Sequence, residues 1–90
     1  MVKRGKLEII KDILAIIKNN QNKIKPTPLL RKSNLSSQRF LEYFNEILQK
    51  GFIKEKTDKK NGREIILTDK GFCYLEKYKN IISFIDEFDL

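Results

Sequence analysis

The sequence predicts an α+β fold that is mostly helical, in which three helices and a β-hairpin precede a long C-terminal helix. Apolar residues recur at helical spacing up to Leu48, and the pattern becomes that of short strands after Gly51. Asn61-Gly62, a strong hairpin signal, separates those strands. Thr68-Asp69 then has the character of a helix start and opens the last helical stretch.

Ninety residues are enough for one domain with its own core. We expect residues 1–90 to form a single domain, with the compact part over 6–68 and the terminal helix over 69–90. No apolar run reaches the roughly 18 residues that a membrane span needs, and the basic start lacks the uncharged core of a signal peptide. We therefore expect a cytoplasmic protein with no membrane partner.

The residue types present argue against catalysis and metal binding. The chain has no histidine, a single cysteine, no glycine-rich phosphate loop and no nucleophile motif. We therefore expect no enzyme, no metal site and no cofactor. Cys73 lies between two aromatic residues, which favours a buried thiol over a reactive one.

The positive charge is unevenly distributed along the chain. Residues 1–63 contain 16 Lys and Arg against 6 Asp and Glu, a net charge of 16 − 6 = +10. Residues 64–90 contain 3 against 6, a net charge of −3, so that the whole chain carries +7. A basic body with an acidic end indicates a polyanionic partner for the body. A lysine-rich composition can also reflect the codon and temperature preferences of an organism.

The first helix is predicted over residues 6–19, where isoleucine and leucine recur on one face. A polar turn follows, and Ile24 is expected to attach that turn to the core. Thr27-Pro28 has the pattern of an N-cap followed by the first residue of a short second helix. That helix is expected to end near Ser33, with Asn34 as its left-handed terminator.

Residues 36–51 are predicted to form the third helix, which makes a helix-turn-helix with the second. Ser36 is expected to cap its first turn and Gly51 to end it. The buried stripe is expected to comprise Phe40, Phe44, Ile47 and Leu48, with Gln38, Glu42, Asn45 and Gln49 on the opposite side. This opposite side is polar without being dominated by charge, which suits the reading of base edges. An ordinary core helix with a solvated face would show the same pattern.

Residues 52–56 and 63–67 are predicted to be the strands of a hairpin. A type I′ turn at Asn61-Gly62 would pair Lys60 with Arg63 and place basic residues at the tip. A basic hairpin directly after a helix-turn-helix is typical of a wing. The alternative is a solvated turn whose lysines have no function.

The terminal helix is predicted from Thr68 to about Phe88, with Phe72 and Leu75 closing the core. Beyond them an apolar stripe outlasts the core that it could cover. Its members, the candidate dimer interface, are Tyr74, Tyr78, Ile81, Ile82, Ile85 and Phe88. We expect this stripe to pair with a second copy of the chain, and the alternative is that it folds back along the first helix.

Two local phrases resemble the winged helix-turn-helix DNA-binding superfamily. They are Leu48-Gln49-Lys50-Gly51-Phe52-Ile53 and Ile66-Leu67-Thr68-Asp69-Lys70-Gly71, within a resemblance that covers residue 6 to about residue 76. The short chain with its C-terminal helix is similar to the small, about ten-kilodalton archaeal winged-helix proteins. Those proteins dimerise through an antiparallel coiled coil and bind DNA, some as chromatin proteins. MarR-like and PadR-like regulators share the same core. This chain departs from the pattern in having only about two heptads and an acidic end.

The resemblance implies double-stranded DNA as a partner, with the third helix in the major groove and the wing on the backbone or minor groove. The candidate DNA-binding residues are Arg31, Lys32, Ser36, Ser37, Gln38, Arg39, Glu42, Lys59, Lys60 and Arg63, with Lys3, Arg4 and Lys6 as further phosphate contacts. We expect a dimeric transcriptional regulator. The alternatives are an architectural chromatin protein with little sequence preference and a winged-helix protein-interaction module.

Overall fold

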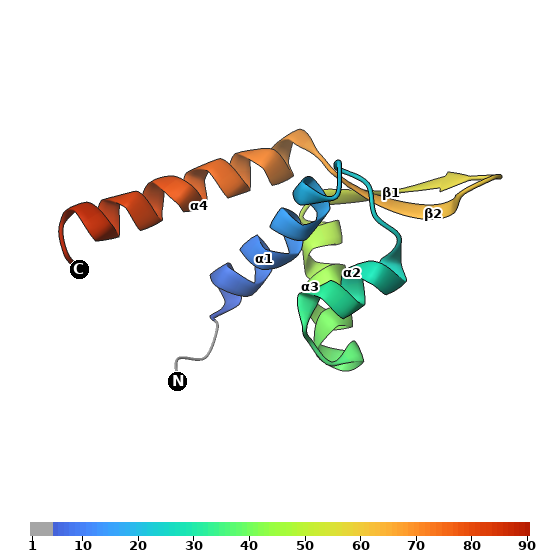
Figure 1. Cartoon of the computed structure of the whole chain (residues 1–90), viewed down its shortest axis with the longest axis horizontal. Coiled ribbons are helices and arrows are strands. Elements are labelled where there is room, and N and C mark those ends of the chain that lie inside the picture. Colours follow the sequence, from blue (N-terminus) through green and yellow to red (C-terminus); the bar gives the residue numbers. More distant parts are fainter. Residues whose placement is uncertain (1–4) are drawn as a thin grey trace.

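A computed structural model describes residues 5–90 and confirms the predicted fold class. Its elements follow the order α1 (Lys6–Asn19), α2 (Pro26–Ser33), α3 (Ser37–Gln49), β1 (Ile53–Asp58), β2 (Gly62–Leu67) and α4 (Asp69–Glu87). The first three helices form a compact body from which the β1–β2 hairpin projects on one side, while α4 runs away on the other (Figure 1). The molecule is accordingly elongated, at 50 × 28 × 21 Å. No helix within residues 5–90 has the length and apolar character needed to cross a membrane.

The hydrophobic core lies where α1, α2, α3 and the hairpin meet. Its buried side chains are Ile9, Ile10, Ile13, Leu14, Ile17, Ile24, Leu29, Phe40, Phe44, Ile47, Ile53, Ile65 and Leu67. The rings of Phe40 and Phe44 stack with centroids 5.5 Å apart. Full burial of each such side chain stabilises the fold by roughly 1.5–3 kcal/mol relative to exposure. This core fixes α3 with its apolar face inward and its polar face outward.

Ile24 is buried in the core, as the sequence predicts, and it also joins the α1–α2 connection to the sheet. Its amide donates to the Ile65 carbonyl at 3.1 Å, and the Ile65 amide donates back at 2.7 Å. The side-chain carbonyl of Asn22 accepts a third bond, from the Leu67 amide at 2.9 Å. The connection therefore forms an isolated antiparallel bridge with β2, which holds the base of the hairpin against the helices.

Helix α2 begins two residues earlier than the sequence pattern predicts. Its N-cap is Lys25 and its first residue is Pro26, whereas the prediction placed the cap at Thr27. Both Pro26 and Pro28 fall in the first turn, where an α-helix leaves the amides unpaired, so neither proline costs a helical hydrogen bond. The end of α2 agrees with the prediction, because Asn34 is left-handed at φ 60° and ψ 31°.

The hairpin tip differs from the predicted type I′ turn. Strand β1 pairs with β2 so that Asp58 lies opposite Gly62, and Lys60 is therefore not paired with Arg63. Positive φ occurs at Gly62, at 73°, but not at Asn61. The Asp58 carboxylate accepts from the Lys60 amide at 3.0 Å and from the Asn61 side-chain amide at 3.2 Å. These bonds stabilise a tip of three residues in place of the predicted two.

Helix α4 begins at a capped and closely packed junction. The Thr68 hydroxyl accepts from the Gly71 amide at 3.2 Å and donates to the Gly51 carbonyl. A Cβ on Gly71 would lie 2.2 Å from the Phe52 carbonyl oxygen, so only glycine fits this crossing without a shift. Leu75 packs on the core as predicted, but Phe72 is 38% exposed and does not close it. Cys73 is also exposed, which corrects the predicted buried thiol.

Candidate nucleic-acid interface

The outward face of α3 carries the polar side chains that the sequence places there. Gln38, Glu42, Asn45 and Gln49 are all exposed, whereas Phe40, Phe44 and Ile47 are buried on the opposite side. The Ser36 hydroxyl accepts from the Arg39 amide at 3.3 Å, which confirms the predicted cap. The amides of the first helical residues, Ser37 and Gln38, have no acceptor within the helix. The start of α3 therefore presents hydroxyls and amide dipoles that favour an anion.

Two features of α3 escape the sequence pattern. Leu41 is 54% exposed beside the polar face, because it lies outside the apolar stripe that packs on the core. Arg39 lies with its guanidinium 6.0 Å from the centre of the Tyr43 ring, one turn along the helix. The only sequence signal for Leu41 is that a leucine interrupts the polar positions of an otherwise regular amphipathic helix.

Contacts within the molecule limit which cations near α3 are free to bind a phosphate. Lys6, predicted to contact phosphate, lies 2.7 Å from the Glu46 carboxylate, on the flank of α3. Lys32 donates to the Asn20 side-chain carbonyl at 3.3 Å, so its ammonium is directed to the α1–α2 connection. Arg31 is exposed on α2. Lys3 and Arg4, the other predicted phosphate contacts, fall outside the described residues.

The hairpin presents a row of cations interrupted by carboxylates. Lys54, Lys56, Lys59, Lys60 and Arg63 are exposed along both strands and the tip, and only the last three were predicted. The Arg63 guanidinium is hydrogen-bonded to the Glu55 carboxylate, and this bond raises the pKa of Arg63 above its ordinary value. Arg63 is therefore charged but already engaged, whereas Lys59 and Lys60 extend from the tip without an ion pair in the described structure.

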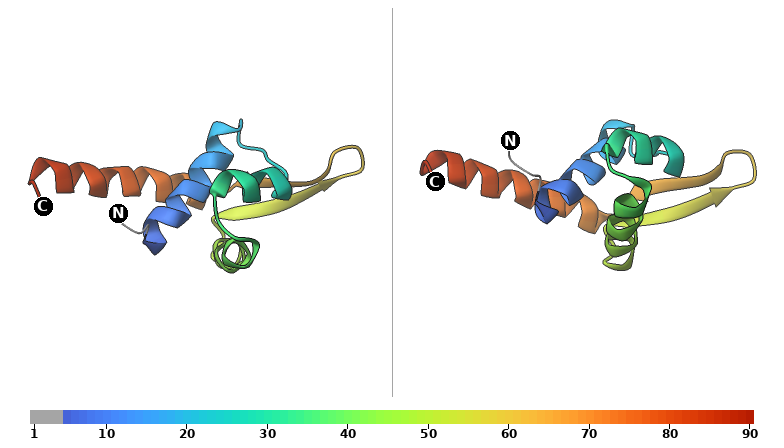
Figure 2. Two further views of the ribbon diagram at one scale, coloured as in Figure 1. Left: turned by 60° about the horizontal axis from the view of Figure 1, so that its bottom comes forward. Right: turned by 90° about the horizontal axis from the view of Figure 1, so that it is seen from below.

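The predicted DNA-binding residues form three groups rather than one. Ser36, Ser37, Gln38, Arg39 and Glu42 lie at the start of α3, Lys59, Lys60 and Arg63 at the hairpin tip, and Arg31 and Lys32 on α2. Figure 2 shows α3 and β1 on one side of the molecule and the α1–α2 connection on the other. Helix α3 leads directly into β1, so the first group is joined to the hairpin whose tip and second strand carry the second group.

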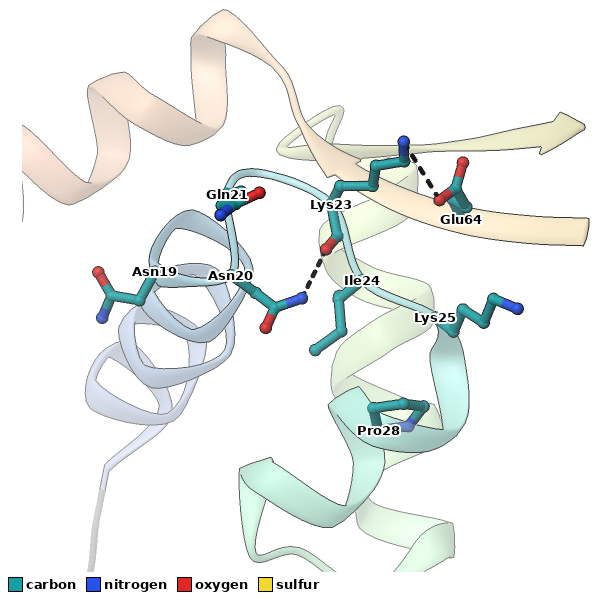
Figure 3. Close-up of a pocket in the computed structure, with 8 residues that line it drawn as sticks. All are labelled: Asn19, Asn20, Gln21, Lys23, Ile24, Lys25, Pro28 and Glu64. Atoms are coloured by element: carbon teal, nitrogen blue, oxygen red, sulfur yellow. Dashed lines mark hydrogen bonds and ion pairs between the residues drawn. The ribbon is translucent and has the colours of Figure 1, made fainter. Parts of the chain in front are cut away.

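A polar cleft lies at the α1–α2 connection, on the side away from α3. It has a volume of about 740 Å³ and is lined by Asn19, Asn20, Gln21, Lys23, Ile24, Lys25, Pro28 and Glu64 (Figure 3). The Lys23 ammonium lies 3.6 Å from the Glu64 carboxylate, which is nearly buried. Asn20 donates to the Lys23 carbonyl at 2.7 Å. These contacts brace the connection against β2, and the cleft contains none of the predicted DNA-binding residues.

The predicted dimer stripe on α4 divides into two parts. Tyr74 donates from its hydroxyl to the Leu7 carbonyl at 2.8 Å, and its ring lies 5.2 Å from that of Phe52. Tyr78 follows, with the Lys11 ammonium 5.6 Å from its ring centre. This proximal part packs against α1, and burial, followed by the neighbouring Tyr78, raises the pKa of Tyr74. The alternative that the stripe folds back along the first helix therefore holds for Tyr74 and Tyr78 alone.

The distal part of α4 is apolar and exposed. Ile81 and Phe84 are each 54% exposed, Phe88 is 57% exposed and Ile82 39%, whereas Ile85 is half-buried. The Phe84 and Phe88 rings are in contact, with centroids 4.9 Å apart, although the predicted stripe omitted Phe84. Next to this surface, between α1 and α4, lies an apolar groove of about 310 Å³. Its lining residues are Leu7, Phe52, Lys70, Cys73, Tyr74, Lys77, Tyr78 and Ile81.

Comparison with known proteins agrees with this architecture. A family model described as winged helix-turn-helix matches residues 3–86. Sso10a-2, a DNA-binding protein from Sulfolobus solfataricus, is similar with a TM-score of 0.74 and 21% identity, over 94% of this chain and 85% of its own. F93 from STIV, a winged-helix DNA-binding protein, is similar with a TM-score of 0.73 and 15% identity, over 89% of this chain and 91% of its own. SSV1 F-93 is similar with a TM-score of 0.63 and 22% identity, over 88% of this chain and 91% of its own. No curated protein sequence matches significantly. At these identities the three structures demonstrate a shared fold.

Proposed function

Because this chain belongs to the winged helix-turn-helix family, we propose that it binds double-stranded DNA and acts as a dimeric transcriptional regulator. One observation carries the proposal: the exposed polar face of α3 begins at an anion-favouring helix start, and α3 lies on the same side of the molecule as β1, the strand that carries the exposed Lys54 and Lys56. Two of the structurally similar proteins are themselves named as DNA-binding. The net charge of +7 supports a polyanionic partner.

In the proposed complex α3 enters the major groove. Ser36 and Ser37 bind a phosphate at the helix start, and the next turn carries the side chains that read bases. Gln38 has the donor and acceptor to pair with adenine, Arg39 can bind guanine with two hydrogen bonds, and Glu42 can accept from cytosine N4. Leu41, exposed beside them, is an apolar surface for a thymine methyl group.

The wing contributes affinity in this proposal, with less influence on sequence preference. Lys59 and Lys60 neutralise phosphates beside the major-groove site or in the adjacent minor groove, and the neutralisation releases counterions. Arg63 joins them only when a phosphate replaces its Glu55 partner. Lys54 and Lys56 lie nearer the base of the wing and extend the cationic row towards α3.

Dimerisation through α4 would present two such units to one DNA molecule. We propose an antiparallel pair with its two-fold axis near Ile81 and Ile82. With the axis at Ile81, each residue faces the one equally distant on the other side of the axis. Phe84 then lies opposite Tyr78 of the partner subunit and Phe88 opposite Tyr74 of the partner subunit, beside the apolar groove. The acidic end of one helix, with Asp86, Glu87 and Asp89, then lies beside residues 73–76 of the other helix, between its Lys70 and Lys77. In this register Asp86 faces Glu76 of the partner subunit, and Lys77 is the next residue along. A parallel pair would place the acidic ends together, at an electrostatic cost.

A DNA titration over a range of salt concentrations tests the proposal. If four to six phosphates are neutralised per subunit, the logarithm of the binding constant should fall with the logarithm of salt concentration by about 0.9 per contact. A slope near zero, or no binding at low salt, would refute DNA binding and favour the protein-interaction module.

Glu42 supports a second candidate function, that of an architectural chromatin protein. Its carboxylate lies in the middle of the exposed α3 face, and near a phosphate it would repel the DNA backbone. A helix that does not enter the groove deeply would bind with little sequence preference. Competition between a selected site and random DNA distinguishes the two, because a regulator discriminates between them and an architectural protein does not.

A further inference from the structure

The tip of the wing carries the one Asn-Gly sequence in the chain. Of the seven asparagines, only Asn61 is followed by glycine, and the others precede larger residues. Both Asn61 and Gly62 are exposed, and a Cβ added to Gly62 would meet nothing within 4 Å. Because Gly62 has no side chain, nothing on this residue hinders the approach of its backbone nitrogen to the Asn61 carboxamide.

We propose that Asn61 is a site of spontaneous covalent modification, which converts the wing tip to an aspartate or isoaspartate form. The Gly62 backbone nitrogen attacks Cγ of Asn61, a C–N bond forms, the Cγ–Nδ2 bond breaks and ammonia leaves. The proton of the Gly62 amide ends on the departing ammonia. Solvent water then opens the cyclic imide at either of its carbonyls. Opening at one carbonyl gives aspartate, and opening at the other gives isoaspartate. No oxidant or reductant is required.

The charges around Asn61 favour the first step. The Gly62 amide nitrogen becomes negative when it loses its proton, and this charge passes to the oxygen on Cγ as the ring closes. Lys59, Lys60 and Arg63 lie within two residues of Asn61. Neighbouring cations stabilise an anionic group relative to its neutral form. Over residues 58–63 these three cations face a single acid, Asp58, a net charge of 3 − 1 = +2.

Conversion of Asn61 to aspartate or isoaspartate removes one of the hydrogen bonds that hold the hairpin tip in its present conformation. The Asn61 amide donates to the Asp58 carboxylate at 3.2 Å, and in the product this donor is replaced by a second carboxylate. Two like charges at that separation repel each other, which also weakens the Asp58 bond to the Lys60 amide. The isoaspartate form adds a carbon atom to the backbone between β1 and β2. The net charge of the tip falls from +2 to +1 in either form.

The consequence for DNA rests on the proposed function, because a tip of lower charge and altered shape neutralises fewer phosphates. An Asn61→Asp chain reproduces the charge of the aspartate product. Its binding should depend less on salt, with a slope smaller by about 0.9 if one phosphate contact is lost. An Asn61→Asp chain with the same slope as wild type would overturn this consequence.

The chemistry itself is tested without DNA. The folded full-length chain is incubated at mildly alkaline pH, digested with a protease and analysed by mass spectrometry for replacement of NH2 by OH. We expect the peptide that contains Asn61 to yield aspartate and isoaspartate products before any peptide with the other asparagines. An Asn61→Gln chain keeps the amide but requires a larger ring, and should show no such conversion at this position.

Persistence of Asn61 while another asparagine converts, or no conversion at all, would overturn the proposal. Conversion at Asn61 in a chain that binds no DNA would support the modification site and refute the proposed function. The two failures are therefore distinguishable.

Discussion

Arg63 is a wing cation whose availability is set by a carboxylate on the neighbouring strand. Glu55 lies diagonally across the hairpin and binds the guanidinium. This pair is exposed, so it adds little to the stability of the fold. Its effect would instead be on binding, because a phosphate must displace Glu55 before Arg63 contributes. No periodicity in the sequence indicates such a pair, since the register of the hairpin decides which side chains are neighbours.

Substitution of the two arginines should distinguish phosphate contact from base reading. Arg63→Ala should weaken binding to all sequences about equally. Arg39→Ala should weaken binding to a preferred site more than to random DNA, by roughly 1–3 kcal/mol if it reads a base. Titration of both DNAs with each variant measures the difference. Glu55→Gln is the matched control, and it should raise affinity for both DNAs because it frees Arg63. Equal losses on both DNAs for Arg39→Ala would favour the architectural protein.

Tyr74 gives the fold a pH dependence on the alkaline side. Burial and the neighbouring Tyr78 raise the pKa of Tyr74, so the folded chain favours the neutral phenol more than the unfolded chain does. Its stabilising contribution should be complete below about pH 10, the ordinary tyrosine pKa, and be lost as pH rises through the folded value. Urea unfolding on both sides of that pH measures the effect. A Tyr74→Phe chain should lose less free energy of unfolding over the same interval, and an equal loss would show that another group is responsible.

The exposed residues of α3 could be predicted because the apolar stripe of an amphipathic helix identifies the buried face, and the exposed face is then the opposite one. Cys73 and Phe72 could not, although both are in a helix whose extent was predicted. Helical spacing reveals which residues share a face, but not how far along that face a neighbouring element reaches. Gly71 brings the start of α4 against Phe52, and Tyr74 and Leu75 rather than Phe72 and Cys73 then turn towards α1 and the core.

At the level of elements, the sequence indicates each helix and strand, and the errors lie at their boundaries. The α1 limits agree with the pattern because a long apolar stripe has a polar turn after it. The start of α2 was misplaced because two prolines fit the first turn of a helix equally well, at Pro26 and at Pro28. The hairpin tip was misplaced because the Asp58 carboxylate competes with the local preference of Asn61-Gly62.

The crossing of α4 over Phe52 provides a test at the level of the element. Gly71→Ala places a methyl group 2.2 Å from the Phe52 carbonyl oxygen, which also accepts a bond from the Thr68 amide. The helix must shift, and we expect a loss of about 1–3 kcal/mol in the free energy of unfolding, the usual cost of overpacking. Chemical denaturation measures it. Ser83→Ala, at an exposed position of the same helix, is the control and should change stability by less than about 0.5 kcal/mol. Similar values for both variants would contradict the close packing at Gly71.

At the scale of the whole molecule, α4 extends away from the body and exposes an apolar surface over its distal half (Figure 1). The sequence indicates this surface because the stripe is longer than the core can cover. It does not indicate where intrachain packing stops, since that depends on the angle between α1 and α4. The apolar groove between these helices, next to Ile81, likewise follows only from the assembled structure.

Pairing of two α4 helices would bury this surface. Burial of each large apolar side chain is worth roughly 1.5–3 kcal/mol, reduced by the entropy lost on association. Sedimentation equilibrium at micromolar concentration should therefore show a dimer. Ile81→Asp combined with Ile85→Asp should give a monomer with lower DNA affinity and an unchanged circular dichroism spectrum per residue, because neither side chain belongs to the core of the body.

The control for this last prediction must separate added charge from lost apolar contact. Asn80→Asp combined with Ser83→Asp adds the same two negative charges to exposed positions outside the predicted stripe. That chain should remain a dimer, because Ile81, Phe84, Ile85 and Phe88 are unchanged. Phe84→Ala with Phe88→Ala should weaken the dimer without any change of charge, since these rings are the ones expected beside the groove of the partner. A wild-type chain that sediments as a monomer would refute the dimer, and the exposed half of α4 would then require a different partner.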